Sequence, residues 1–245
     1  MNLKGKTALV TGGAVRIGKA ICEALASQGC HVIIHYGHSQ AKAEELKEHL
    51  KTYNVEVTLI QADLSDTQQI DRVISHALKQ VPAIDILINN AAIFPEPDTF
   101  SEINHEQWNM LMDINLRAPT FISKDFSAHI ASRNSNGCII NIIDARYQKT
   151  GNDHFSYRLG KFALAELTRM LALELAPNIR VNGIAPGAIL PPPGKGQDFL
   201  ERNKRKKVPL STVGNAHIIA QNVLHLIQQD FVTGQVISVD GGEFI

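Results

Sequence analysis

The sequence predicts an α/β protein built on a doubly wound parallel β-sheet of about seven strands, with helices on both faces. Short apolar runs alternate along the chain with segments whose apolar residues recur at helical spacing. The runs are apolar at consecutive positions, which is typical of strands buried on both sides in a parallel sheet. No repeat, low-complexity tract or linker divides residues 1–245, so we expect one domain.

The elements follow in order from the same patterns. Apolar runs predict strands over residues 6–10, 31–35, 56–61, 84–88, 138–143, 181–185 and 235–239. Helical periodicity predicts helices over residues 16–28, 40–53, 66–80, 105–132 and 156–176. Pro119 is a candidate kink in the fourth helix, and Pro177 stops the fifth. Residues 187–209 are rich in Pro, Gly, Lys and Arg, and an ordered loop of this length is usually functional, so we expect a substrate lid there.

Composition limits the partners that the chain can bind through charge. The 24 Lys and Arg residues equal the 24 Asp and Glu residues, so the formal net charge is zero. This balance argues against a nucleic-acid or membrane-surface binder that depends on a strong positive field. No apolar run approaches the roughly 20 residues that span a bilayer. The ten histidines show no compact metal-ligand spacing, so we expect no metal site.

The three cysteines Cys22, Cys30 and Cys138 form no CxxC pair. Their number is odd, and the chain begins with no signal-like segment. We therefore expect a cytoplasmic protein in which the cysteines are small buried hydrophobic residues.

A glycine-containing turn follows the first predicted strand and precedes the first predicted helix. Gly12, Gly13 and Gly18 stand in it, and Arg16 occupies a position where a further glycine is common. A helix N-terminus offers unpaired N–H groups and a positive dipole end to a pyrophosphate, and glycines let the phosphate approach the backbone. We expect a dinucleotide here, with a plain tight turn as the alternative.

The end of the second predicted strand indicates which dinucleotide is used. An NAD enzyme usually places an acidic residue there for the ribose hydroxyls. This chain has no carboxylate between Glu23 and Glu44. It offers His35, His38, Ser39 and Lys42 instead, with Arg16 able to reach the same region. These donors would hold a 2′-phosphate, so we predict NADP(H); the alternative is that they are ordinary surface residues.

Two further strand ends carry candidate ligand contacts. Asp63 either accepts hydrogen bonds from an adenine amino group or caps the following helix, as Ser65 also could. Asn89, Ala91 and Ala92 end the fourth predicted strand, where ligands of open α/β sheets collect.

A tyrosine and a lysine open the helix that follows the fifth predicted strand. The spacing of Tyr157 and Lys161 places both on one helix face, and Asp144 lies thirteen residues earlier. A neighbouring ammonium favours the phenolate, so we expect Lys161 to lower the Tyr157 pKa toward a value useful in acid–base catalysis. The sequence therefore predicts Tyr157 as a proton donor; the alternative is a surface Tyr–Lys pair.

At these residues the chain resembles the short-chain dehydrogenase/reductases over nearly its full length. The motifs that carry the resemblance are Thr11–Gly18, Asn89–Ala91, Asn115, Tyr157 with Lys161, Pro186-Gly187 and Val239–Gly242. The resemblance implies a Rossmann-type sheet, hydride transfer from a nicotinamide and a homotetramer.

Two departures from the common family pattern narrow the resemblance. Most members carry serine where Asp144 stands and glycine where Arg16 stands. Together with Tyr157 and Lys161, these residues resemble the pteridine reductase branch, including dihydromonapterin and dihydrofolate reductase-like members. Phe94 matches the aromatic residue that stacks on the pterin in that branch. The segment 35–39 resembles its NADP-binding segment, although His38 replaces a common arginine.

The resemblance implies NADPH-dependent reduction of a pteridine of the dihydropterin, biopterin or monapterin type, with dihydrofolate as a side substrate. Tyr157 would protonate a ring nitrogen, Asp144 would orient Tyr157, and Arg16 would contact both cofactor and pterin. Phe94 is alternatively a buried loop anchor, and Asp144 a turn cap. The implied cofactor contacts are Gly12, Arg16, Ile17, Gly18, His35, Tyr36, His38, Ser39, Asp63, Leu64, Asn90, Ala91, Lys161, Pro186 and Gly187.

Two rival functions remain open at this point. One is a carbonyl reductase acting on 3-oxoacyl chains, and the other is a non-catalytic NADPH-binding regulator. The basic run Arg202–Lys207 is either a solvated face or an attraction site for the glutamate tail of a folate-like substrate.

Overall fold

The structure, a computed structural model, describes residues 1–94, 96–191, 196–203 and 207–245. Its centre is a seven-stranded parallel sheet with the order β3-β2-β1-β4-β5-β6-β7. The strands are β1 Thr7–Val10, β2 His31–Tyr36, β3 Val57–Gln61, β4 Ile86–Asn89, β5 Gly137–Ile142, β6 Ile179–Pro186 and β7 Val236–Val239. The predicted fold class and strands are confirmed, with ends that shift by one or two residues.

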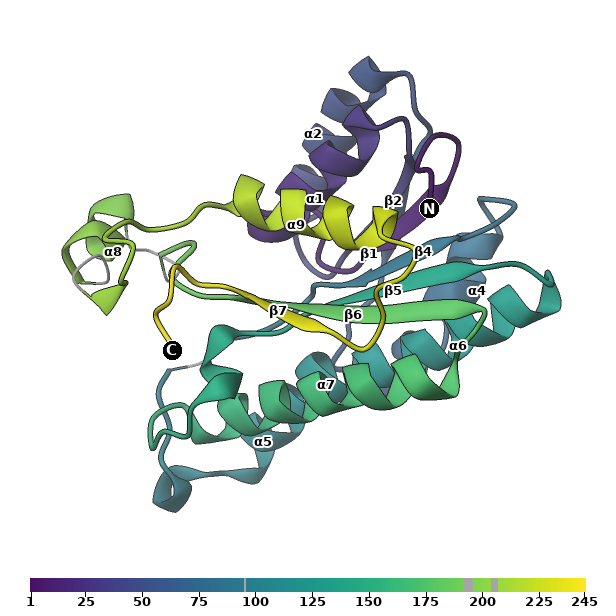
Figure 1. Cartoon of the computed structure of the whole chain (residues 1–245). Helices are drawn as coiled ribbons and strands as arrows, with labels where there is room; N and C mark the ends of the chain where they lie inside the picture. Colours follow the sequence, from purple (N-terminus) through teal and green to yellow (C-terminus); the bar gives the residue numbers. More distant parts are fainter. Residues whose placement is uncertain (95, 192–195, 204–206) are drawn as a thin grey trace.

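Helices cover both faces of the sheet (Figure 1). One face carries α1 Arg16–Ser27, α2 Gln40–Leu50 and α9 Ala216–Gln228. The other carries α4 Val73–Leu78, α5 His105–Met112, α6 Ala118–Ser132 and α7 Phe155–Glu174. α8 Gln197–Asn203 lies away from both layers, beyond the carboxyl ends of the strands.

The buried strands explain the continuous apolar runs in the sequence. Ala8 and Val10 of β1 point into one core, whereas Leu9 between them points into the core on the opposite face. All three side chains are completely buried. A strand with helices above and below needs apolar residues at every position, because both of its faces are dry.

Two expected helices are interrupted. The segment 66–80 forms two helices, α3 Thr67–Ile70 and α4, which are separated by Asp71 and Arg72. The segment 105–132 forms α5 and α6, joined by a wide π-helical turn over Asp113–Arg117. Pro119 has no N–H to donate to the carbonyl four residues earlier, so a regular α-helical ladder cannot continue through it. The expected irregularity near Pro119 is therefore a π turn in front of it.

Two helices near the C-terminus have no counterpart in the sequence prediction. α9 is capped by Asn215, whose side chain accepts a hydrogen bond from the amide of Ile218. Ile219, Val223 and Ile227 of this helix are buried. α8 lies inside the segment 187–209 that was expected to be a loop; residues 192–195 and 204–206 of that segment are outside the described residues. No helix in the described ranges is long and apolar enough to cross a membrane.

Candidate active site

A cavity of about 640 Å³ lies at the carboxyl edge of the sheet. Its walls come from the segments that follow β1 to β6 and from the start of α7. Ligands of open parallel sheets bind at this edge. The predicted cofactor residues that line the cavity are Gly12, Arg16, Ile17, Gly18, His35, His38, Asp63, Leu64, Asn90, Ala91, Lys161, Pro186 and Gly187. Tyr36 and Ser39 do not line it.

The turn between β1 and α1 is packed so tightly that glycine is required. A Cβ atom at Gly18 would lie 2.2 Å from the carbonyl oxygen of Gly12, and Gly12 has a left-handed backbone (φ +60°). The amides of Gly12 and Gly13 are already used, since they donate to Nδ1 and the carbonyl of His35. The two glycines therefore shape the turn, and the first-turn amides of α1 are the ones left for a phosphate.

Arg16 opens α1 in a strained conformation. Its φ of +54° lies in the left-handed region that favours glycine, which accounts for the glycine expected at this position. Its guanidinium Nη2 donates to the carbonyl of Pro191 at 2.8 Å. Arg16 thus connects the glycine turn to the segment that follows β6.

His35 lines the cavity and also holds two neighbouring segments together through its ring nitrogens. Its Nδ1 accepts from the amide of Gly12 at 3.2 Å, and its Nε2 lies 3.1 Å from the carbonyl of Ala62. Burial lowers the pKa of His35 to about 4. The ring is therefore neutral at pH 7 and ties the glycine turn to the segment after β3.

Asp63 does not cap a helix. Its Oδ1 accepts from the amide and the hydroxyl of Ser65 at 2.9 and 2.7 Å. The cap of α3 is Asp66, whose carboxylate accepts from the amides of Gln68 and Gln69. The capping alternative for Asp63 is therefore wrong, and Asp63 remains a residue of the cavity wall.

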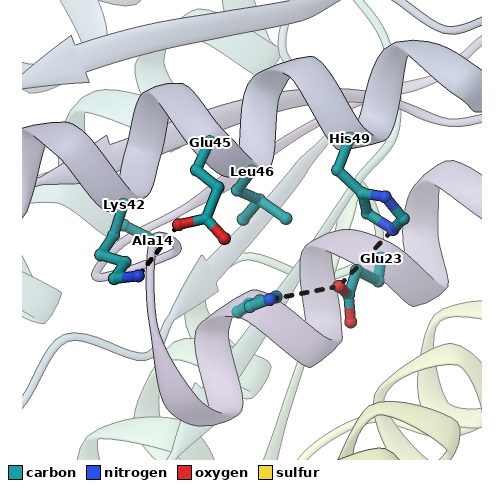
Figure 2. Close-up of a pocket in the computed structure, with 7 residues that line it drawn as sticks. Ala14, Glu23, Lys42, Glu45, Leu46 and His49 are labelled. Carbon is teal, nitrogen blue, oxygen red and sulfur yellow. Dashed lines mark hydrogen bonds and ion pairs between the residues drawn. The ribbon is translucent and has the colours of Figure 1, made fainter.

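Lys42 lies outside the main cavity. Figure 2 shows it in a second hollow between α1 and α2, where its Nζ is 2.9 Å from Glu45 Oε2. On the other side of this hollow, Glu23 lies 3.8 Å from the Nε2 atom of His49. The ammonium that the sequence suggested for a 2′-phosphate is therefore engaged by a neighbouring carboxylate. His35 and His38 of the same predicted set line the main cavity.

The predicted catalytic residues meet where β5 ends and α7 begins. The phenol of Tyr157 donates to Asp144 Oδ2 at 3.0 Å. The same oxygen accepts from Arg146 Nη1 at 3.2 Å, while Asp144 Oδ1 accepts from the Arg146 amide at 2.8 Å. Asp144 thus caps the short turn Ala145–Gln148 and also holds Tyr157, so both interpretations of this residue describe it.

The expected lowering of the Tyr157 pKa by Lys161 is wrong. Burial first, and Asp144 second, raise the pKa of Tyr157 well above its ordinary value. Lys161 Nζ lies 5.8 Å from the Tyr157 ring centroid and donates to the carbonyl of Ile142 at 3.0 Å. Burial lowers the pKa of Lys161 to about 8. The two residues share a helix face as predicted, but the tyrosine is paired with a carboxylate and keeps its proton.

Phe94 stands at the open part of the cavity beside Tyr157. Its ring is 40% exposed and meets the Tyr157 ring edge-on at 4.8 Å between centroids. The Arg146 guanidinium carbon lies 5.3 Å from the Phe94 centroid. Asn115 holds the preceding residue through two hydrogen bonds with the backbone of Ile93. Phe94 is therefore an exposed wall of the site, and the buried-anchor alternative is wrong.

Several lining residues carried no signal in the sequence. Arg146 is one of them, because a lone arginine after a strand has no motif; only the turn after Asp144 brings it over Phe94. Apolar walls come from distant segments, including Met110, Ile114 and Phe244. Within the described ranges, no group of three or more His, Cys, Asp or Glu residues is placed to hold a metal ion.

The fold and the cavity together define an α/β protein of the Rossmann type, with a hydrogen-bonded Tyr157–Asp144 pair in the cavity wall. Comparison with known proteins narrows this class to a family. The sequence model of the short chain dehydrogenase family matches residues 6–198, and the chain belongs to this family.

Individual relatives span almost the whole chain. A 3-oxoacyl-[acyl-carrier-protein] reductase FabG of Staphylococcus aureus is 30% identical over 98% of both chains. Glucose 1-dehydrogenase 2 of Bacillus subtilis is 29% identical over 98% of this chain and 95% of its own. Among solved structures, FolM alternative dihydrofolate reductase 1 from Brucella canis, complexed with NADP, is similar with a TM-score of 0.91 and 34% identity, covering 100% of this chain and 96% of its own.

Proposed function

We propose that this protein is an NADPH-dependent reductase that reduces a dihydropterin, with dihydrofolate as a side substrate. The observation that carries the proposal is the exposed ring of Phe94 standing beside the Tyr157–Asp144 pair inside the cavity. A flat heterocycle needs an aromatic wall next to the proton donor, and this pair of contacts provides one. The similarity to the FolM structure supports the same conclusion.

The residues present fit NADP(H) as the cofactor. The glycine turn before α1 leaves no room for side chains where a pyrophosphate would approach. No carboxylate stands between Glu23 and Glu44, and His38 lines the cavity after β2, so a 2′-phosphate would meet a donor rather than a repelling charge. Arg16 lines the same end of the cavity. When bound, the reduced nicotinamide supplies the hydride.

The chain's own residues supply the proton and the orientation. Phe94 would stack on the flat ring, and Tyr157 would transfer its phenolic proton to the ring nitrogen next to the carbon that accepts the hydride. Asp144 holds the phenol in place beforehand through the 3.0 Å hydrogen bond. The phenolate left after transfer would lie near Arg146, whose positive charge opposes the effects of burial and of Asp144 on the Tyr157 pKa.

The proposal also includes an assembly state and a location in the cell. We expect assembly as a homotetramer and a cytoplasmic location. Size-exclusion chromatography with light scattering checks the first, and a smaller assembly would contradict it.

The second candidate function is reduction of a 3-oxoacyl chain or a small ketone. The 30% identity with the FabG enzyme favours it. The apolar wall formed by Met110, Ile114 and Phe244 would also accept an acyl chain. A regulator that binds NADPH without turnover is the third candidate, and the complete Tyr157, Asp144 and Lys161 set argues against it.

The test is NADPH oxidation measured with a dihydropterin, dihydrofolate and a 3-oxoacyl ester, with NADH as the alternative reductant. We expect kcat/KM to be highest with the dihydropterin, by roughly tenfold or more. Phe94→Leu is the matched variant, since it keeps an apolar wall but removes the ring, and it should reduce dihydropterin turnover more than ester turnover. A preference for the ester would overturn the proposal, and NADPH binding without any turnover would favour the regulator.

A further inference from the structure

The first turn of α7 holds the segment that follows β4. The amide of Phe155 donates to the carbonyl of Asp98 at 3.1 Å. The hydroxyl of Ser156 donates to the carboxylate of Asp98 at 2.5 Å, and both side chains are buried. The segment that carries Phe94 is thus fastened to the same helix turn that carries Tyr157.

His154, the N-cap of α7, packs against the ring of Phe94. Its ring centroid lies 4.4 Å from that of Phe94, with 33° between the ring planes. Phe94 meets Tyr157 on another side, edge-on at 4.8 Å. The ring of Phe94 is therefore held between two residues of α7 and its cap, His154 and Tyr157, which stand three positions apart.

The conformation of His154 is unusual in two respects. Its backbone is left-handed, with φ 50° and ψ 48°, a region that few residues other than glycine, asparagine, aspartate and histidine adopt readily. Its side chain is only 8% exposed, and its Nδ1 atom is buried without a hydrogen-bond partner in the described part of the chain. Native structures rarely leave a buried polar atom unpaired, so this arrangement calls for a reason.

The charged groups near the His154 ring have opposite effects on its pKa. Burial lowers its pKa, Arg146 and Arg158 lower it further, and Asp153 and Asp98 raise it. The net direction is downward, so the ring is neutral at pH 7. A neutral ring can pack against the face of Phe94 at little desolvation cost, which makes stacking its best-supported role.

We propose that His154 is a positioning residue, which fixes the ring of Phe94 beside Tyr157 and thereby favours flat heterocyclic substrates over flexible ones. This inference rests on the proposed function. His154 would act through Phe94, with which it makes the ring contact.

The test is a double-mutant cycle with His154→Asn, Phe94→Leu and the combined variant. Asparagine tolerates the left-handed backbone, so His154→Asn removes the ring with little backbone strain. We expect the dihydropterin KM to rise roughly 3- to 10-fold, the size of an aromatic pair contact, with a smaller change in kcat. Because His154 acts through Phe94, the combined variant should be no worse than Phe94→Leu alone. His76→Asn, an exposed position on α4, is the control.

Two results would overturn the inference about His154. A dihydropterin KM that stays unchanged in His154→Asn, with unaltered NADPH affinity and melting temperature, would overturn the inference. So would a combined variant whose effect equals the product of the two single effects, since that would show independent roles. A wild-type enzyme that reduces no dihydropterin would instead defeat the proposed function itself.

Discussion

Tyr157 donates its phenolic hydrogen to Asp144 Oδ2 over 3.0 Å, and the same carboxylate oxygen accepts from Arg146. A phenol that is buried and paired with a carboxylate keeps its proton, which is why the Tyr157 pKa lies well above its ordinary value. The group is held as an acid in a fixed direction. A protonated phenol is the form that the proposed reduction requires, since Tyr157 must then deliver a proton to the substrate.

Lys161 should reduce the stability of the protein before cofactor binds. Its side chain is 2% exposed, and burial lowers its pKa from 10.5 to about 8. At pH 7 the residue is charged in both the folded and unfolded states, so the folded state carries the full cost of the buried charge, about 3 kcal/mol. Lys161→Met should therefore raise the melting temperature of the cofactor-free protein while abolishing activity.

The pH dependence of the melting temperature tests whether the buried Lys161 charge is the reason that Lys161→Met is more stable than the wild type. Between pH 8 and 10.5 the unfolded chain binds the Lys161 proton and the folded chain releases it, so the stability of the wild type rises with pH across this window. The advantage of Lys161→Met should shrink as the pH rises from 7 to 9.5. Melting curves recorded at both pH values test this, and a variant less stable than the wild type at pH 7 would contradict the account.

His35 should contribute to acid sensitivity. Its pKa is about 6.5 in the unfolded chain and about 4 in the folded protein, where burial disfavours the charged ring. As the pH falls from 6.5 toward 4, the unfolded state binds a proton that the folded state does not, so stability falls by up to about 3 kcal/mol.

His35→Asn removes this titration. We expect the variant to be less stable at pH 7, because the contacts with Gly12 and Ala62 are weakened, but to lose less stability on acidification than the wild type. Thermal melts at pH 7 and pH 5 measure both quantities, with His76→Asn as the surface control. Equal losses in wild type and variant would show that His35 is not responsible.

Arg16 offers a matched pair of substitutions. Arg16→Ala and Arg16→Gly both remove the guanidinium, and we expect both to weaken NADPH binding by about tenfold or more with a smaller effect on NADH. They differ in the backbone, because φ +54° suits glycine, so Arg16→Gly should melt at a higher temperature than Arg16→Ala. Titration calorimetry measures the dissociation constants of the two coenzymes. Equal losses of affinity for NADPH and NADH would contradict a role of Arg16 in binding the 2′-phosphate.

The sequence predicts those features that depend on local patterns. Consecutive apolar residues such as Ala8, Leu9 and Val10 identify buried strands, because both faces of a parallel sheet are dry. Helical spacing places Tyr157 and Lys161 on one face. The helix α9 was also predictable, since Asn215 caps it and apolar residues follow at helical spacing.

Features that depend on three-dimensional direction are not predictable in this way. The spacing of Tyr157 and Lys161 does not reveal that the ammonium turns to the carbonyl of Ile142, or that burial outweighs its effect on the phenol. Arg146 enters the site only through the turn that Asp144 caps. Likewise, nothing in the spacing of Phe94 and His154 indicates that their rings meet.

The central claim is that Tyr157 delivers the proton in a hydride-transfer reduction. The most direct measurement is the turnover of Tyr157→Phe with a dihydropterin at saturating NADPH, together with its NADPH affinity. We predict that kcat falls by about 10²- to 10⁴-fold, the contribution of a positioned acid, while the NADPH dissociation constant changes little. A variant that keeps more than half of the wild-type turnover would show that the proton comes from another group.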